Sequence, residues 1–158
     1  MTRELTLTDI AGYLPYGLYC WYGENIKPAL MIGITDYRIP IFKVGRKPIL
    51  RPMSDLCEEI TERGYNDGKP FVPLVEFAKV RYPYLTSRRF ITDTKYFECA
   101  ENDASGWEKM YELELESMSV DELDLLHRLH LDYRGLIDAG LAVSVHDLKQ
   151  NPYGAGIS

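Results

Sequence analysis

The stretch Lys47–Leu56, KPILRPMSDL, carries the densest local instructions in this chain of 158 residues. Two X-Pro steps restrict the backbone on either side of the apolar pair Ile49 and Leu50. Ser54 is suited to cap a helix, because its hydroxyl can accept a hydrogen bond from a free backbone amide. The stretch is therefore predicted to follow three short strands and to open a helix that runs to about Arg63.

Upstream of this stretch, the chain shows one helical turn and three strand-like runs. Thr8 is placed to cap the turn Asp9–Leu14. The runs are rich in aromatic and β-branched residues, as strands are, and they cover Leu18–Tyr22, Ala29–Tyr37 and Ile39–Val44. Together they predict that a sheet begins in the first third of the chain.

Downstream, the pattern changes to helix, hairpin and helix. A turn at Tyr65–Lys69 leads to a second short helix, for which Pro73 at the first helical position is a typical start. Lys95–Ala100 and Lys109–Glu116 are predicted to form a β-hairpin, and Glu112, Glu114 and Glu116 alternate on its solvated face. A capping box of Ser119 and Glu122 opens the longest predicted helix, Val120–Tyr133. Its apolar stripe comprises Leu123, Leu126, Leu129 and Tyr133. A last short strand covers Leu141–Val145.

This order of elements predicts an α+β fold. We expect a single compact domain over residues 1–150, with a mixed or mainly antiparallel sheet of about five or six strands and about two to four helices. Residues 151–158 are Gly-rich and are expected to form a flexible C-terminal tail.

The cysteines and the start of the chain indicate a cytoplasmic protein. The three cysteines, Cys20, Cys57 and Cys99, form no CxxC pair, so neither a disulfide framework nor a zinc site is indicated. A secretory signal is lacking, and the longest apolar run is too short to span a membrane. We therefore expect no membrane partner.

Charge is unevenly placed along the chain, although the net charge is −6. Residues 1–92 hold 13 Lys and Arg against 10 Asp and Glu, whereas residues 93–158 hold 5 against 14. The longest basic stretch without an acid supplies the candidate anion- or partner-binding residues, which are Arg38, Lys43, Arg46, Lys47 and Arg51. Such polarity either steers an anionic partner or lets the two halves complement each other, in the fold or in a homo-oligomer.

Aromatic residues are interleaved with these cations, as in nucleotide-binding sheets. A second basic patch contains Lys79, Arg81, Arg88 and Arg89. Because the whole chain is acidic, the pattern favours a small nucleotide-like anion or a protein partner and disfavours a long nucleic acid. Arg46 and Arg51 are expected to be exposed, so that reversing their charge would remove anion binding without harming the fold.

Catalytic and metal-binding patterns are weak. His127 and His130 have the i, i+3 spacing that can hold a metal, but no second ligand cluster accompanies them. We expect His130 to lie in the core and His127 to be exposed on the flank. Cys20 lies in an aromatic strand, where a thiol is usually buried and inert. The expectation is no catalytic residue, no metal and no cofactor, although an enzyme whose site assembles from scattered residues stays open.

Four segments resemble a group of small hypothetical proteins from phages, prophages and mobile elements of gut Bacteroidales-type bacteria. They are LPYGL at Leu14–Leu18, KPILRPMSDL at Lys47–Leu56, FVPLVEFAK at Phe71–Lys79 and GLIDAGLA at Gly135–Ala142. The likeness follows most of the chain in the same order, apart from Asp93–Trp107. It implies an accessory cytosolic protein of phage or mobile-element origin, and it carries over no catalytic residue.

Three functions follow as hypotheses. The first is a non-enzymatic accessory protein that binds a host or phage partner, in morphogenesis, replication support or counter-defence. The second is a protein that binds or sequesters a small nucleotide-like anion. The third is an enzyme with a site that the sequence does not reveal. Converging Arg and Tyr side chains would favour the second, and an exposed apolar surface would favour the first.

Overall fold

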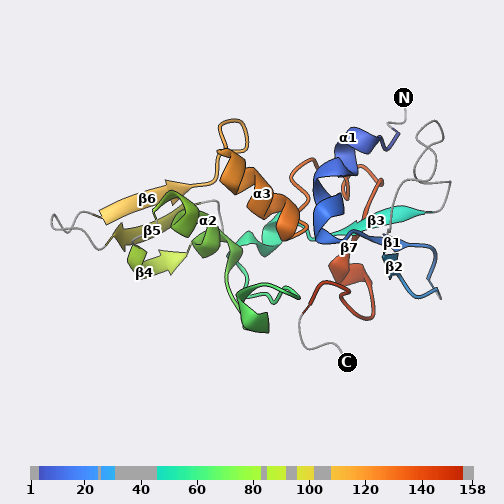
Figure 1. The fold of residues 1–158 in the computed structure, drawn as a ribbon, viewed down its shortest axis with the longest axis horizontal. Coiled ribbons are helices and arrows are strands. Elements are labelled where there is room, and N and C mark those ends of the chain that lie inside the picture. Colours follow the sequence, from blue (N-terminus) through green and yellow to red (C-terminus); the bar gives the residue numbers. More distant parts are fainter. Residues whose placement is uncertain are drawn as a thin grey trace. The chain divides into compact units, whose positions relative to one another are not determined.

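The computed structural model describes residues 4–24, 26–30, 46–82, 85–91, 96–101 and 108–154 (Figure 1). For residues 85–91, 96–101 and 108–110 the description covers the backbone. The contacts divide the chain into two compact units. Unit 1 comprises Met1–Pro52 and Leu126–Pro152, and unit 2 comprises Met53–Leu125 and Tyr153–Ser158. The predicted α+β class is confirmed, whereas the single domain over residues 1–150 stays a prediction.

Unit 1 contains a mixed four-stranded sheet, short helical turns at the N-terminus and a 3-10 turn after its last strand. Its elements are α1 (Leu7–Ile10), η1 (Ala11–Tyr16), β1 (Tyr19–Trp21), β2 (Ala29–Leu30), β3 (Lys47–Leu50), β7 (Val143–Ser144) and η4 (Val145–Asp147). The strand order is β2-β1-β3-β7, and β3 pairs with β1 in antiparallel and with β7 in parallel orientation. The predicted strands at Leu18–Tyr22 and Leu141–Val145 are thus confirmed in shorter form, whereas residues 31–45, including the predicted strand Ile39–Val44, lie outside the described residues.

The opening of KPILRPMSDL is a strand and not a lead into a helix. β1 pairs with Lys47 and Pro48, and β7 pairs with Ile49 and Leu50. Proline is unusual in an inner strand because it has no amide hydrogen to donate. Here each ladder is only two residues long, and the ladder to β7 begins after Pro48. The missing donor is therefore tolerated between two strands.

The N-terminal turn is capped by Thr6 and not by Thr8. The amide and the hydroxyl of Thr6 both donate to the carboxylate of Asp9, at 3.0 and 3.1 Å. This arrangement starts the helix two residues earlier than predicted. The following 3-10 helix contains Pro15 and ends at Gly17, whose φ of 78° lies in the left-handed region that favours glycine.

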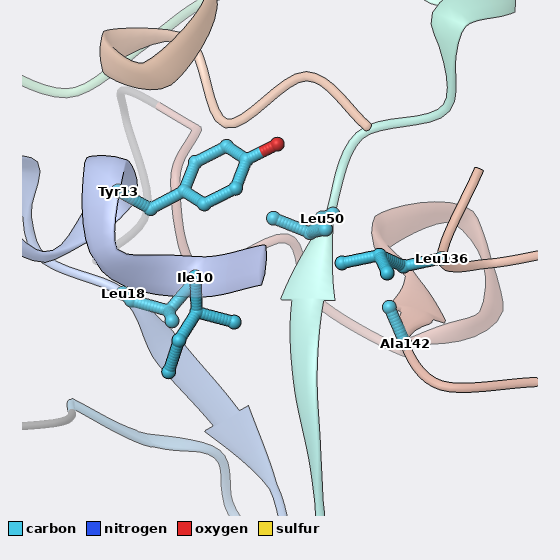
Figure 2. Packing of buried hydrophobic residues seen from close by; sticks show 6 residues of the cluster. All are labelled: Ile10, Tyr13, Leu18, Leu50, Leu136 and Ala142. Atoms are coloured by element: carbon cyan, nitrogen blue, oxygen red, sulfur yellow. The ribbon is translucent and has the colours of Figure 1, made fainter. Parts of the chain in front are cut away.

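One face of the sheet of unit 1 forms the core with residues that are distant in sequence (Figure 2). The cluster consists of buried side chains from the N-terminal turns, the residue before β1, β3 and the segment before β7, and they are Ile10, Tyr13, Leu18, Leu50, Leu136 and Ala142. Five of the six are fully buried, and Ala142 is nearly so. Burial of such side chains provides the main favourable free energy for folding this unit.

Unit 2 contains an antiparallel three-stranded sheet and a short α-helix. Its elements are η2 (Met53–Cys57), η3 (Asn66–Gly68), α2 (Pro73–Arg81), β4 (Leu85–Ile91), β5 (Tyr96–Glu101) and β6 (Glu108–Glu112), and α3 (Val120–Arg128) begins in this unit. The strand order is β4-β5-β6, and both pairings are antiparallel. The helix that starts at Pro73 is confirmed, and so is the predicted hairpin, although its second strand ends at Glu112 and not at Glu116. Strand β4 was not predicted from the sequence.

The helix predicted from Ser54 to Arg63 is wrong. The chain forms only the short 3-10 helix η2 and then extends, because Ile60 pairs with Phe71. Their backbones exchange two hydrogen bonds, of 2.8 and 2.9 Å. A non-local bridge thus overrides the local helical tendency of the segment.

Helix α3 starts as predicted but ends five residues early, at Arg128. His130 has a φ of 58°, which terminates the helix and lets the amide of Leu131 donate to the carbonyl of Leu126. Leu131 then forms a parallel bridge with Arg51. The prediction of helix up to Tyr133 is therefore wrong, because backbone pairing claims the residues after Arg128.

The predicted C-terminal tail begins within the described residues. Tyr153 is buried in unit 2, and its carbonyl accepts a hydrogen bond from the amide of Arg63 at 2.7 Å. The start of a flexible tail at residue 151 stays a prediction. In the part of the chain that the structure describes, no helix is long and apolar enough to cross a membrane.

Candidate functional site

The five predicted binding residues do not share one environment. Arg38 and Lys43 lie outside the described residues. Arg46 is exposed, Lys47 is partly buried in β3, and Arg51 is only 2% exposed. The expectation that Arg51 is exposed is therefore wrong. Of the three predicted binding residues that the structure describes, Arg46 and Lys47 have side chains that a partner can reach.

Arg51 is buried because the chain that follows β3 continues into the interior of unit 1. Its amide donates to the carbonyl of His130 at 2.7 Å, and its carbonyl accepts from the amide of Asp132 at 2.8 Å. Burial of a cation is unfavourable unless other groups compensate its charge. Arg51 is thus a structural residue of this bridge.

Arg46 lies directly before β3 and packs over an aromatic ring. Its guanidinium carbon is 5.1 Å from the centroid of the Tyr22 ring. A cation in this position is attracted by the electron-rich face of the ring. Burial raises the pKa of the nearby Cys20 thiol to about 11, and the charge of Arg46 lowers it only in part. The thiol is therefore protonated at neutral pH, as predicted for an inert buried cysteine.

Strand pairing assembles an aromatic surface on the side of the sheet that faces away from the core cluster. In the register, Tyr19 lies opposite Leu30 and Trp21 lies opposite Lys47. Opposed residues share one side of a sheet, and so do residues two apart along a strand. We call these four residues, Tyr19, Trp21, Leu30 and Lys47, the aromatic face.

The aromatic face is partly accessible. Leu30 is 44% exposed, and the other three residues are of intermediate exposure. A Cβ atom at Gly17 would lie 3.3 Å from the Cδ1 atom of Leu30, so the leucine side chain lies over the glycine backbone. The neighbouring Tyr16 is 40% exposed. Ile49, two residues beyond Lys47, is fully buried and marks the end of the accessible part.

The opposite side of the sheet is closed along β1 and β3, whereas Ala29 on the edge strand β2 is exposed. Cys20 and Pro48, which oppose each other, are both buried, and Leu18 and Leu50 on this side belong to the core cluster. Along β1 and β3 this side is therefore occupied by the core of unit 1, and the aromatic face is the side on which these two strands can meet a partner.

The two histidines of the predicted helix serve structural roles. Nε2 of His130 lies 2.8 Å from the carbonyl of Gly17, and Nε2 of His127 lies 2.7 Å from the hydroxyl of Tyr133. Both rings are buried, so the expected exposure of His127 is wrong. A Cβ atom at Gly12 would clash with the His127 ring, which shows how closely this ring packs on the backbone.

Tyr13 is held in the same way. Its hydroxyl donates to the carbonyl of Leu131, and burial raises its pKa well above the ordinary value. Its ring makes an edge contact with the His127 ring at a centroid distance of 5.0 Å. A buried tyrosine that stays protonated and is bonded to a backbone carbonyl positions the chain and is unsuited to act as a nucleophile or base.

Unit 2 has its own buried polar centre at Glu122. The carboxylate accepts hydrogen bonds from Arg81 at 2.8 Å, from Tyr111 at 2.6 Å and from Ser119 at 3.1 Å. Burial raises the pKa of Glu122, but these hydrogen bonds outweigh that effect and the pKa is lowered overall. Ser119 and Glu122 thereby form the predicted capping box, and the same carboxylate neutralises Arg81 of the second basic patch.

Metal binding and paired-carboxylate catalysis gain no support from the described residues. Over these residues, no group of three or more His, Cys, Asp or Glu side chains is placed to hold a metal ion. Glu114 and Glu116 are exposed and Glu112 is half-buried, whereas Tyr111 and Leu113 on the other side are buried. The carboxylates are accessible to solvent as predicted, but they do not share one strand face, because β6 ends at Glu112 and Glu114 and Glu116 lie in the loop that follows. Elemental analysis of the dialysed protein remains the test of the prediction that no zinc is bound.

The aromatic face could be recognised only in part from the sequence. The alternating aromatic residues of β1 were visible, and so was the basic character of Lys47. The signal that joins them is the pairing of β3 with β1, which Pro48 concealed because proline argues against an inner strand.

Comparison with known proteins identified no relative of this chain. Neither a family model, nor a curated protein, nor a solved structure matches the chain.

Proposed function

We propose that this chain is a non-enzymatic accessory protein of phage or mobile-element origin that acts by binding a protein partner. The observation that supports binding is the aromatic face, where Tyr19, Trp21 and Leu30 stay accessible on the side of the sheet opposite to the core. The phage or mobile-element origin is supported by the resemblance of the four sequence segments alone.

The composition of this face is suited to a protein interface. Tyrosine and tryptophan provide a large contact area with few rotatable bonds, and they are enriched at the energetic centres of interfaces. Leu30 adds an exposed aliphatic side chain next to them. A monomeric protein that leaves such residues accessible on one surface commonly uses that surface for recognition.

The buried ionisable groups favour binding over catalysis. Tyr13 and His130 are bonded to backbone carbonyls, and Glu122 is bonded to three side chains. These contacts hold the fold together, and the groups are buried away from any substrate. A catalytic acid or base needs access to its substrate within hydrogen-bonding distance.

A peptide-display selection against the purified full chain tests the proposal. The variant Leu30→Asp places a charge on the face, and Val120→Asp is a matched control, because Val120 is 75% exposed and belongs to unit 2. We expect selected peptides to bind the parent and Val120→Asp alike and to bind Leu30→Asp at least about tenfold more weakly. Peptides that bind Leu30→Asp as tightly as the parent would overturn the proposal.

A second candidate function is the capture of a small nucleotide-like anion by Arg46 and Lys47. The supporting observation is that the exposed guanidinium of Arg46 is ordered over the Tyr22 ring beside Lys47. Calorimetric titration with ATP should show binding that Arg46→Glu abolishes and that Lys149→Glu, an exposed control in unit 1, leaves intact. Heat that is absent in the parent, or equal in Arg46→Glu, would remove this candidate.

A further inference from the structure

We propose that the segment that occupies the aromatic face is an acidic peptide that combines carboxylates with apolar side chains. This inference rests on the proposed partner binding and specifies its chemistry. The geometry that supports it is the juxtaposition of Lys47 with Trp21 across the β1–β3 ladder, with Leu30 opposite Tyr19 on the other ladder.

The charges of unit 1 favour an anionic partner. This unit holds 10 Lys and Arg against 7 Asp and Glu, a net charge of +3. Two of its acids are already engaged, because Asp9 accepts from Thr6 and lies 3.4 Å from Arg134, and Asp132 accepts from two backbone amides. Lys47 on the face and Arg46 directly before it therefore present positive charge beside the aromatic rings.

The apolar residues specify that the partner is not a bare anion. Leu30 and Trp21 offer surface that only apolar atoms can cover with a gain in free energy. A phosphate or a plain carboxylate would contact the cations and leave this surface in water. A peptide with both kinds of side chain satisfies both halves of the face.

The remaining charge of the chain argues against a long nucleic acid. Unit 2 holds 8 Lys and Arg against 17 Asp and Glu, a net charge of −9. The chain as a whole is therefore acidic, which disfavours association with a long polyanion. Nucleic-acid affinity also grows with the number of phosphates that cations neutralise, and within the residues that the structure describes the face and its flank offer Lys47 and Arg46 alone.

Fluorescence anisotropy with dye-labelled probes tests the proposal on the full chain. Three peptides of about ten residues are compared, one of Glu and Leu, one of Lys and Leu, and one of Glu and Ser, together with a single-stranded oligonucleotide of similar length. We expect only the Glu–Leu peptide to bind tightly. Its affinity should fall by about tenfold in Lys47→Glu and change by less than about twofold in the control Lys149→Glu.

A second variant and a salt series keep the test independent of folding. Arg46→Glu alters an exposed residue outside the strand, so it should weaken the same peptide with an unchanged circular dichroism spectrum. For the parent chain, raising the salt concentration from about 0.05 M to about 0.5 M should weaken binding of the Glu–Leu peptide, because salt screens the attraction between its carboxylates and the cations of the face.

The outcomes distinguish this inference from the proposed function. Equal binding of the Lys–Leu peptide, lost in Leu30→Asp, would overturn the acidic preference while partner binding at the face stands. Binding of the oligonucleotide alone would overturn both, and so would the absence of binding by every probe together with an unproductive display selection. A doubled mass in sedimentation that Leu30→Asp abolishes would assign the face to a second copy of this chain and overturn the inference.

Discussion

The buried groups His130 and Tyr13 of unit 1 and Glu122 of unit 2 are held in different ways. In unit 1, His130 and Tyr13 are bonded to backbone carbonyls. In unit 2, the buried carboxylate of Glu122 is bonded to the side chains of Arg81 and Tyr111. The net charges differ as well, at +3 for unit 1 and −9 for unit 2.

This difference predicts which changes should lower the stability of each unit. A hydroxyl bonded to a backbone carbonyl carries no net charge, so its burial costs little once the bond is made. A buried carboxylate requires several donors to replace its hydration. Unit 2 should therefore respond to protonation of Glu122, whereas the neutral contact of Tyr13 in unit 1 should not respond to acid. Unit 1 also buries two carboxylates, Asp9 and Asp132, which accept hydrogen bonds, and its exception is the buried cation Arg51.

The largest effect is expected at that exception. Arg51→Glu should lower the free energy of unfolding by roughly 4 kcal/mol, because it buries an uncompensated charge of the wrong sign. Arg46→Glu, an exposed cation five residues earlier, should change it by less than about 1 kcal/mol. Urea unfolding monitored by circular dichroism measures both, and equal effects would show that burial does not separate the two arginines.

The next effect concerns shape in unit 1. Leu126 is fully buried, so Leu126→Ala should cost about 3 kcal/mol through lost apolar burial and the cavity that remains. Leu123, on the same predicted stripe but only half-buried, should cost clearly less. A melting temperature that Leu126→Ala leaves unchanged would show that the end of α3 contributes nothing to the core.

Acid should reveal the ionic centre of unit 2. Because folding lowers the pKa of Glu122 below its ordinary value of 4.5, its contribution to stability is complete above that pH and is lost as the pH falls through the lowered pKa. Glu122→Gln should cost about 2 kcal/mol at neutral pH and flatten the loss of stability below about pH 4.5. Urea unfolding at a series of pH values measures this, and a variant with the slope of the parent would contradict the assignment.

The smallest expected change in stability concerns the neutral hydrogen bond of Tyr13 in unit 1. Tyr13→Phe removes the hydrogen bond to the Leu131 carbonyl and should cost about 1 kcal/mol. Because burial raises the pKa of Tyr13, the hydroxyl is protonated throughout the acid range, so this loss should be constant from about pH 3 to about pH 7. A loss that changes with pH would show that the residue is coupled to an ionisable group in that range.

Local signals in the sequence predicted the elements that depend on neighbouring residues. The start of α3 at the Ser119–Glu122 box and the start of α2 at Pro73 follow from contacts within one helical turn. The hairpin of β5 and β6 follows from alternation along each strand. These features were predictable because the interacting groups lie within a few residues of one another or repeat at a fixed period.

Two wrong predictions, the helix from Ser54 to Arg63 and the extension of α3 to Tyr133, share a different origin. Ile60 leaves the predicted helix to pair with Phe71, and α3 ends early because Leu131 pairs with Arg51. In both cases a backbone partner from a distant part of the chain competes with the local preference and prevails. Local propensities of a few tenths of a kcal/mol per residue are too small to resist such pairing.

Composition and short spacings alone predicted the α+β class, the starts of α2 and α3 and the polarity of charge. Only the tertiary structure decided that Arg51 is buried while Arg46 is exposed, and that Lys47 stands opposite Trp21 on the aromatic face. The reason is physical: burial and strand register are properties of chain segments brought together from far apart. Of two arginines five residues apart, the one after β3 enters the interior and the one before it remains in water.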